Sequence, residues 1–331
     1  MKEITLRGTF YEMGKQYGEA CKKNIKSFAK MTYLMASLAK KPGSQPFNPN
    51  LWYFIPTYFT YKKEKPKWQA LAKEYEKKIL EYHPDAIEFM KGIAEGADIP
   101  YIDVLSLNIS TENIITCSLW GASGKSTKND EPIIAMNVDE EPMAQKFETF
   151  LDINPDKGYR YKVTAFSGWV GYNHGMNEKG LAVASSLLWT KPAEEEKPRP
   201  PMLVLMKVLN TCSSVEQVKE FFESVPNHAL GTVFYIADSE KFMRVECTPQ
   251  KRVYEIVENG SLGTTNILMS EELQKYDGFS LLKQPLNAKN RRKRMTKLLN
   301  EHEGKIDKDI VHLIASDHGE KGSETYMKSM C

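Results

Sequence analysis

Apolar residues recur three to four positions apart over residues 9–40, a periodicity that predicts an amphipathic helix. The segment Lys41–Asn50 holds three prolines and a glycine and predicts a loop. A charged stretch with helical periodicity follows over residues 67–99, with an interruption near Pro84. Up to about residue 112 we therefore expect a mostly helical chain.

Short β-rich runs replace the helical periodicity in the rest of the chain. Runs of β-branched and aromatic residues, punctuated by Gly, Asn and Asp, predict strands over residues 114–123, 131–139, 146–153, 159–176, 180–189, 231–238, 242–248 and 252–260. Residues 201–224 are expected to be helical, with Ser213 and Ser214 as a cap in the middle, and residues 290–304 and 308–319 return to helix. Helices segregated from antiparallel strands indicate an α+β fold, a layered sandwich in which helices cover sheets.

Composition and charge exclude several classes of protein. Hydrophobic residues make up 41% of the chain and charged residues 27%, which argues against disorder. With 45 Lys+Arg against 43 Asp+Glu, the chain lacks the concentrated positive field that nucleic acid or an anionic membrane requires. Five scattered cysteines without a C-x-x-C pair favour neither a disulfide scaffold nor a zinc site. Since no secretion signal or long apolar window is present, we expect a soluble, cytoplasmic protein with reduced thiols.

Cys117 is the candidate nucleophile. A thiol is mostly protonated near neutrality, so it needs a base. That base is usually histidine, but a second solution exists: if the bond between Thr116 and Cys117 is broken, Cys117 gains its own α-amine, whose reference pKa is about 7.7–8.0. Such an amine can take the thiol proton without any histidine. The alternative on residue type alone is that an isolated strand cysteine is a small apolar filler.

Several sequence segments together resemble one family. The run TCSLWGASGKSTKNDEPIIAMNVDEEP, which begins at Thr116, carries a Cys-Ser strand, a turn and a second strand ending in Asn137-Val138-Asp139. The segment GTFYEMGKQYGEA precedes this run, and SGWVGYNHGMNEKGLAVASS, GTTNILMSEE and an arginine-rich tail with S-D-H follow it. Motifs of these kinds occur in this order in one known family. The chain resembles the penicillin acyl-transferase family (acyl-coenzyme A:6-aminopenicillanic acid acyl-transferase-like cysteine N-terminal-nucleophile, or Ntn, hydrolases) from about residue 6 to 320.

The resemblance implies a single Ntn-hydrolase domain over residues 1–331, with a four-layer αββα sandwich made as an inactive precursor. Cys117 would attack the Thr116 carbonyl and leave a mostly helical fragment, 1–116, associated with a catalytic chain, 117–331. The freed Cys117 would then cleave a linear amide or a thioester, with water or an amine as acceptor. No metal or organic cofactor is implied. Thr116 departs from the glycine that commonly precedes the nucleophile, and its β-branched side chain predicts slow or absent cleavage.

The family match gives roles to further residues. Asp139 would hold the Cys117 ammonium, Asn266 would donate to the oxyanion together with a backbone N–H, and Arg291 would order the site near Asp139 or the substrate. Each has a structural alternative: a turn-capping Asp, a loop Asn, or a solvated basic helix face. The neighbours Arg292 and Arg294 leave the arginine assignment open to a slip of one residue. Asn137, Asn173 and Asn177 are the candidate substrate-binding residues, although Asn is also common in left-handed turns.

Two rival functions remain on the sequence alone. A conventional thiol hydrolase without cleavage would use His174, His228 or His318 as its base, and a non-catalytic member of the fold would only bind a ligand. The aromatic block over residues 51–61 would wall an acyl pocket or simply pack in the core. The basic run over residues 289–297 is better explained by an amphipathic surface helix than by a nucleic-acid patch, and GASGKST is expected to form a hairpin turn.

Overall fold

The computed structural model describes residues 1–39, 54–110, 116–139, 142–191, 201–225, 231–278 and 285–319. These residues form two compact units whose segments alternate along the chain. The first unit holds residues 1–113, 142–158 and 164–171, and the second holds the remainder. Within the described residues, no helix has the length and apolar character needed to cross a membrane.

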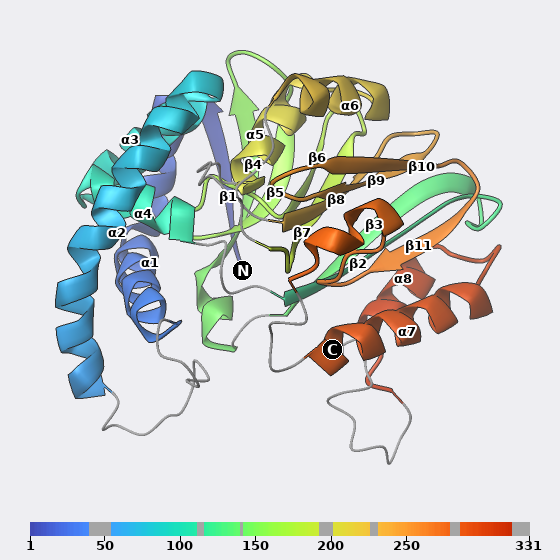
Figure 1. The fold of residues 1–331 in the computed structure, drawn as a ribbon. Helices are drawn as coiled ribbons and strands as arrows, with labels where there is room; N and C mark the ends of the chain where they lie inside the picture. Colours follow the sequence, from blue (N-terminus) through green and yellow to red (C-terminus); the bar gives the residue numbers. More distant parts are fainter. Residues whose placement is uncertain are drawn as a thin grey trace. The chain divides into compact units, whose positions relative to one another are not determined.

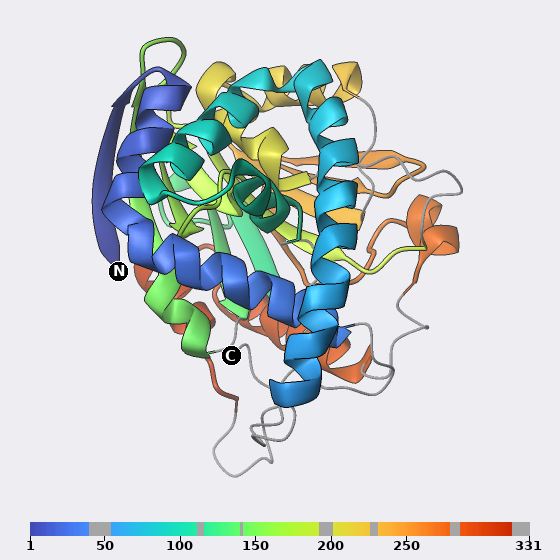
Figure 2. The same cartoon turned by 90° about the vertical axis from the view of Figure 1, so that its left-hand side faces the viewer.

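The first unit combines helices with the start of a large sheet. Its elements are β1 (Lys2–Gly8), α1 (Phe10–Ala39), α2 (Phe54–Tyr82), α3 (Pro84–Ala97), α4 (Tyr101–Ser110), the 3-10 helix η3 (Pro142–Phe147) and β4 (Glu148–Pro155). In Figure 2 the α-helices of this unit are drawn in blue to blue-green. The helical character and the break near Pro84 are confirmed. Strand β1 was not predicted, because it pairs in parallel with β4, a partner far along the chain that local periodicity does not reveal.

Glycines let α1 and α3 pack backbone against backbone. Gly14 on α1 and Gly92 on α3 face the other helix so closely that an added Cβ would lie 2.2 Å from the Phe89 carbonyl oxygen and 2.1 Å from the Tyr11 carbonyl oxygen, respectively. Real Cβ atoms do not approach backbone this closely, so any side chain would push the helices apart. The glycine spacing of the segment GTFYEMGKQYGEA therefore has a packing reason.

The second unit contains two stacked sheets. Its larger sheet has the strand order β5-β6-β7-β8-β9-β10, and its smaller sheet has the order β11-β2-β3. The residues of β5 (Tyr161–Phe166) are divided between the two units. The strands are β6 (His174–Asn177), β7 (Ala182–Leu188), β8 (Gly231–Ala237), β9 (Phe242–Cys247), β10 (Arg252–Val257), β2 (Thr116–Gly124), β3 (Asp130–Asp139) and β11 (Gly260–Thr264). Strands β7 to β10 pair antiparallel with their neighbours.

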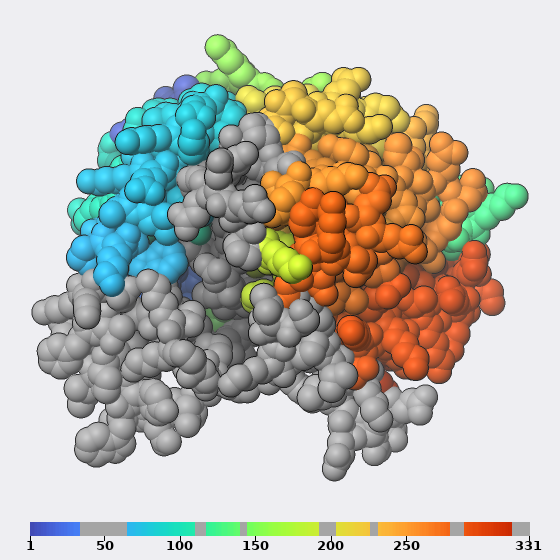
Figure 3. Space-filling view, in the orientation of Figure 1, coloured from blue at the N-terminus to red at the C-terminus, as the bar shows by residue number. Residues whose placement is uncertain are grey.

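Helices cover both outer faces of the second unit. On the larger sheet, α5 (Pro201–Thr211) contacts β6 and β7, and α6 (Val215–Ser224) contacts β8. On the smaller sheet, α7 (Pro285–Glu301) contacts β11 and β2, and α8 (Lys308–Ala315) contacts β3. Because β2 and β3 in turn contact β7, β8 and β9, the layers follow the order helix, sheet, sheet, helix (Figure 1). In Figure 3, α5 and α6 (yellow) and α7 (red-orange) lie on opposite sides of this unit.

The predicted caps and turns of the second unit are confirmed. Ser214 is the N-cap of α6, since its side chain accepts a hydrogen bond from the backbone N–H of Gln217. The GASGKST segment turns between β2 and β3, and Gly124 there has a φ of +54°, a conformation that favours glycine.

The order of the layers confirms the expected α+β class and the αββα sandwich. The single domain and the cleavage into 1–116 and 117–331 stay predictions.

Candidate active site around Cys117

The hairpin of β2 and β3 brings the predicted nucleophile and the predicted carboxylate to the same end of the smaller sheet. In the antiparallel register, Thr116 lies opposite Asp139 and Cys117 lies opposite Val138. The 20-residue spacing between the Cys-Ser and Asn-x-Asp motifs thus becomes direct cross-strand pairing. All residues of the site described below belong to the second unit.

Strand alternation places the Cys117 side chain between the two sheets. Gly121, on the same face of β2, has the Phe242 ring of β9 as its nearest neighbour. Trp120, on the opposite face, belongs to the cluster that contains Met295 of α7. Because successive side chains of a strand point to opposite faces, Cys117 faces the larger sheet, and only 1% of its surface is exposed.

Arg291 connects the backbone of Cys117 to the carboxylate. Its Nη1 donates to the Cys117 carbonyl oxygen (2.9 Å) and to Ser118 Oγ (2.5 Å), and it lies 3.3 Å from Asp139 Oδ2. Its Nη2 donates to Asn266 Oδ1 (3.1 Å). Ser118 points toward α7 by the same alternation that turns Cys117 the other way. The Arg291 side chain is 6% exposed, so this ion pair is shielded from solvent on one side.

Asn266 holds the backbone nitrogen of Cys117. Its Oδ1 accepts from the Cys117 N–H (3.3 Å), while its Nδ2 donates to the Leu187 carbonyl oxygen (2.9 Å) and to Ser186 Oγ (3.2 Å). Two donors at Oδ1 and a carbonyl at Nδ2 determine the orientation of the amide. The segment before Asn266 is tied to α7, because Thr265 Oγ1 donates to the Ala288 carbonyl oxygen (3.0 Å).

Ser186 is a site residue that sequence reasoning missed. Its hydroxyl, on β7, is 1% exposed, accepts from Asn266 Nδ2 and lowers the pKa of the Cys117 thiol. Its one signal in the sequence is the pair of serines inside the apolar run AVASSLL, where the strand is otherwise filled with hydrophobic side chains. A buried hydroxyl in such a strand needs a polar partner, and here that partner is Asn266, which also binds the Cys117 nitrogen.

The thiol of Cys117 is held in its protonated form in this uncut chain. Burial raises the pKa of Cys117, and the negative charge of Asp139 raises it further. The Ser186 hydroxyl and the Arg291 guanidinium act in the opposite direction without outweighing burial. Near neutral pH the side chain is therefore a thiol, and attack requires that its proton move to another group.

The three candidate asparagines lie in different places. Asn137 donates through Nδ2 to the Ala315 carbonyl oxygen (2.8 Å) and so ties β3 to the end of α8. Asn177 donates to the Leu209 and Cys212 carbonyl oxygens at the end of α5 and accepts from two backbone N–H groups of the β6–β7 turn, so its side chain has a structural role. Asn173 is 5% exposed. Contact of any of the three with a substrate stays a prediction.

Of the alternative site residues, His174 and His318 are described, whereas His228 and the side chains of the aromatic block are not. Burial lowers the pKa of His174, and its Nδ1 has no hydrogen-bond partner within the described residues. His318 is exposed after the end of α8. His228, together with Trp52 and Tyr53, lies outside the described residues, and nothing is described of the side chains over 54–64.

Three neighbouring arginines of α7 have three different surroundings. Arg291 contacts the Cys117 carbonyl oxygen and Asn266, and its role in catalysis stays a prediction. Arg294 forms two hydrogen bonds to the Asp317 carboxylate (2.7 and 3.0 Å) and so connects α7 to the end of α8. Arg292 points to a third place, among charged side chains of the larger sheet.

These layers and this cysteine-centred network define an Ntn-hydrolase fold. The model of the family described as acyl-coenzyme A:6-aminopenicillanic acid acyl-transferase matches residues 126–328, more than half of the chain, and the chain belongs to this family. The matched range contains Asp139, Asn266 and Arg291 and begins after Cys117.

Individual relatives are distant in sequence. An uncharacterized protein of Archaeoglobus fulgidus is 25% identical over 253 residues, which span 69% of this chain and 38% of that protein. Among solved structures, the Caenorhabditis elegans N-acylethanolamine-hydrolyzing acid amidase ortholog is 12% identical with a TM-score of 0.48, over 63% of this chain and 89% of that chain. Penicillin V acylase from Agrobacterium tumefaciens is 14% identical with a TM-score of 0.33, over 66% and 71%.

Proposed function

We propose that this protein is a cysteine Ntn hydrolase that cuts its own chain between Thr116 and Cys117 and then cleaves linear amides through an acyl-enzyme on Cys117. The observation that carries the proposal is the hydrogen bond from the Cys117 N–H to Asn266 Oδ1, because this nitrogen becomes the free amine after cleavage. Membership of an acyl-transferase family supports a small acyl amide or acyl thioester as substrate.

The self-cleavage begins with attack of Cys117 Sγ on the carbonyl carbon of Thr116. The C–S bond forms and the C–N bond breaks, while the thiol proton passes to the departing nitrogen of Cys117. Water then hydrolyses the thioester, which releases the carboxylate of Thr116 and restores the thiol. Arg291 supports this step by fixing the Cys117 carbonyl group, so that rotation about the reacting residue is restricted.

The same atoms would serve the catalytic cycle. The free amine of Cys117, held at Asn266 Oδ1, takes the thiol proton while Sγ attacks the substrate carbonyl carbon. Asn266 Nδ2 points to the Ser186 hydroxyl beside the thiol, where an oxyanion would develop. A donor of this kind contributes about 2.7–4 kcal/mol to a transition state. The protonated amine then gives its proton to the leaving amine, and water or a second amine takes the acyl group from sulfur.

The negative charge of Asp139 gives this residue a role in stabilising the protonated amine of Cys117. Asp139 lies opposite the residue that precedes the new N-terminus and is paired with Arg291 at 3.3 Å. Its carboxylate would favour the ammonium form of Cys117 at the moment when the amine has accepted a proton. Among the described residues, the side chains with the largest effects on the pKa of the Cys117 thiol are Asp139, Ser186 and Arg291.

Intact-mass measurement of the purified protein tests the cleavage. We expect two chains, 1–116 and 117–331, from the wild type, and one uncut chain from Cys117→Ala. Cys212→Ala serves as the matched control, since it removes another buried thiol and should cut normally. A wild type that stays a single chain after prolonged incubation would contradict the proposal and favour the non-catalytic or Cys/His alternative.

The rate of self-cleavage should depend on pH in a defined direction. Because burial and Asp139 raise the pKa of Cys117, the thiolate fraction stays small at neutral pH and grows about tenfold with each pH unit below the pKa. We therefore expect precursor made by cell-free synthesis and shifted to buffers between about pH 6 and 8 to cut faster at each higher pH. A cleavage rate that is constant across this pH range, or highest at its acidic end, would show that the rate does not follow the thiolate fraction of Cys117.

A further inference from the structure

A second group of polar side chains lies where the larger sheet faces the smaller sheet, on the face of the larger sheet that Cys117 meets. Tyr235 on β8, Arg244 and Glu246 on β9, and Glu255 on β10 share one face of the larger sheet, because Arg244 pairs in register with both Tyr235 and Glu255. Arg292 of α7 completes the group, since the charges of Arg244 and Glu246 act on its guanidinium. We call these five residues the arginine cluster.

The acidic members of the arginine cluster are already engaged. Glu246, fully buried, accepts from the backbone N–H groups of Met269 (3.0 and 3.1 Å) and Ser270 (2.9 Å). Its Oε1 is 3.7 Å from Arg244 Nη1. Glu255 pairs with Arg244 Nη2 at 2.5 Å, but its side chain is 43% exposed. One carboxylate thus serves mainly backbone donors, and the other lies at the solvent edge.

The carboxylate whose charge acts on Arg292, that of Glu246, is already bound by backbone N–H groups. The Nε of Arg292 is buried without a hydrogen-bond partner among the described residues, and the same is true of the hydroxyl of Tyr235, a residue with 0% exposure. Burial, together with the like charge of Arg244, lowers the pKa of Arg292. Buried polar groups almost always have partners, and leaving one unpaired costs about 1–3 kcal/mol. These two unpaired donors, beside a second guanidinium, are groups to which an anion could bind.

The arginine cluster is within reach of a substrate bound at Cys117. Across the larger sheet, Ser186 of β7 pairs with Val233 of β8, and Val233 pairs with Glu246 of β9. Glu246, a member of the arginine cluster, therefore lies two strands from Ser186, which neighbours Cys117. Two strand spacings amount to about 10 Å, and the arginine side chains shorten that gap. The segment from Asn266 to Ser270 connects both places, because its first residue binds the Cys117 nitrogen and its last binds Glu246.

We propose that Arg292 and Arg244, with the Tyr235 hydroxyl, bind a carboxylate group of the substrate, so that the enzyme prefers acyl amides that carry a free carboxylate on the acyl or the amine portion. A guanidinium fits a carboxylate with two parallel hydrogen bonds, and a phenol adds a third donor. This inference rests on the proposed function, since it names the substrate class of the same site.

Paired substrates test the preference. Succinyl, glutaryl and adipyl para-nitroanilides carry the carboxylate on the acyl portion, and their terminal carboxamides are neutral analogues of the same shape. Pentanoyl-glycine and pentanoyl-glycinamide place the same difference on the amine portion. We expect the wild type to favour the acid of at least one pair by about tenfold or more in kcat/KM, as a charged hydrogen bond predicts.

Variants of α7 assign that preference to the cluster. Arg292→Gln should bring the ratio of kcat/KM for the acid to kcat/KM for the carboxamide close to one, and Arg292→Lys should keep part of the preference. Lys293→Gln, which removes a charge from the exposed side of the same helix, should behave as the wild type. Equal losses on acid and carboxamide in Arg292→Gln would show a structural role and overturn the inference, as would a wild type without preference in any pair.

A binding measurement separates this inference from the proposed function. Glutarate should raise the Tm of the purified wild type, glutaramide should not, and Arg292→Gln should lose the response. If no nitroanilide or glycine conjugate is cleaved but glutarate still binds through Arg292, the proposed activity fails and the carboxylate site stands. If the substrates are cleaved without regard to charge and glutarate gives no shift, the activity stands and the carboxylate site is wrong.

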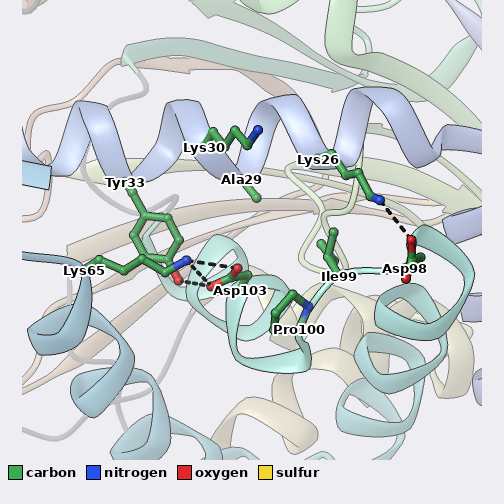
Figure 4. A pocket seen from close by; sticks show the side chains of 9 residues that line it. All are labelled: Lys26, Ala29, Lys30, Tyr33, Lys65, Asp98, Ile99, Pro100 and Asp103. Carbon is green, nitrogen blue, oxygen red and sulfur yellow. Dashed lines mark hydrogen bonds and ion pairs between the residues drawn. The ribbon is translucent and has the colours of Figure 1, made fainter. Parts of the chain in front are cut away.

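A solvent-accessible pocket of about 260 Å³ in the first unit carries no comparable inference. It lies among α1, α2 and the start of α4, and two of its three lysines pair with carboxylates (Figure 4). Lys65 pairs with Asp103 at 3.1 Å, and Lys26 pairs with Asp98 at 3.1 Å. Asp103 also accepts a hydrogen bond from the Tyr33 hydroxyl at 2.8 Å, so both carboxylates of the pocket are engaged.

Discussion

Replacing Arg291 with glutamine should slow self-cleavage before Cys117 by about 10²-fold or more. Arg291 is the one described residue that contacts the Cys117 carbonyl oxygen, Asn266 Oδ1 and the Asp139 carboxylate together. Without it, Asn266 is held by fewer bonds and Asp139 loses its ion pair. A displacement of about 1 Å at a reacting centre is enough for a loss of this size.

The measurement is the fraction of uncut chain over time, by mass spectrometry, for variants that remain folded by thermal unfolding. Arg291→Lys keeps the charge but not the forked geometry and should recover only part of the rate. Arg294→Gln is the matched control, because it removes an arginine ion pair from the same helix without touching the site. Cleavage of Arg291→Gln at the wild-type rate would show that Arg291 does not position the reacting residue.

Substituting alanine at both Gly14 and Gly92 should destabilise the first unit by several kcal/mol. Each added Cβ would overlap a backbone carbonyl oxygen of the facing helix, at 2.2 and 2.1 Å. Backbone cannot rotate away as a flexible side chain does, so α1 and α3 must separate and lose their packing. Overpacking of this kind costs about 1–3 kcal/mol at each position. Since the two sites share one interface, we expect the losses not to be additive.

Thermal and urea unfolding of the two single variants and the double variant measures this loss. Glu19→Ala is the control on α1, because it lies on the exposed side next to the packed glycines and should change the free energy of unfolding by less than about 0.5 kcal/mol. Gly14→Ala should lower the midpoint of unfolding on its own. Stability equal to that of the Glu19→Ala control would contradict the close packing of the two helices.

Local pattern was sufficient for most of the elements. The helix break near Pro84, the Ser214 cap and the hairpin turn at Gly124 follow from residues a few positions apart, and the structure confirms all three. The α+β class and the family follow from the order of these elements and from motifs spread along the chain. Strand β1 escaped prediction because its partner, β4, is far away in sequence.

The amino-acid sequence by itself determined the elements, the family and a short set of candidate residues, and Cys117, Asp139, Asn266 and Arg291 stand close together as that set requires. Only the tertiary structure decided which of the neighbouring arginines meets which partner, and only it revealed Ser186 and the arginine cluster. The physical reason is that periodicity states which face of an element is buried. It does not state which distant side chain fills the facing position, and hydrogen bonds depend on that position to within a fraction of an ångström.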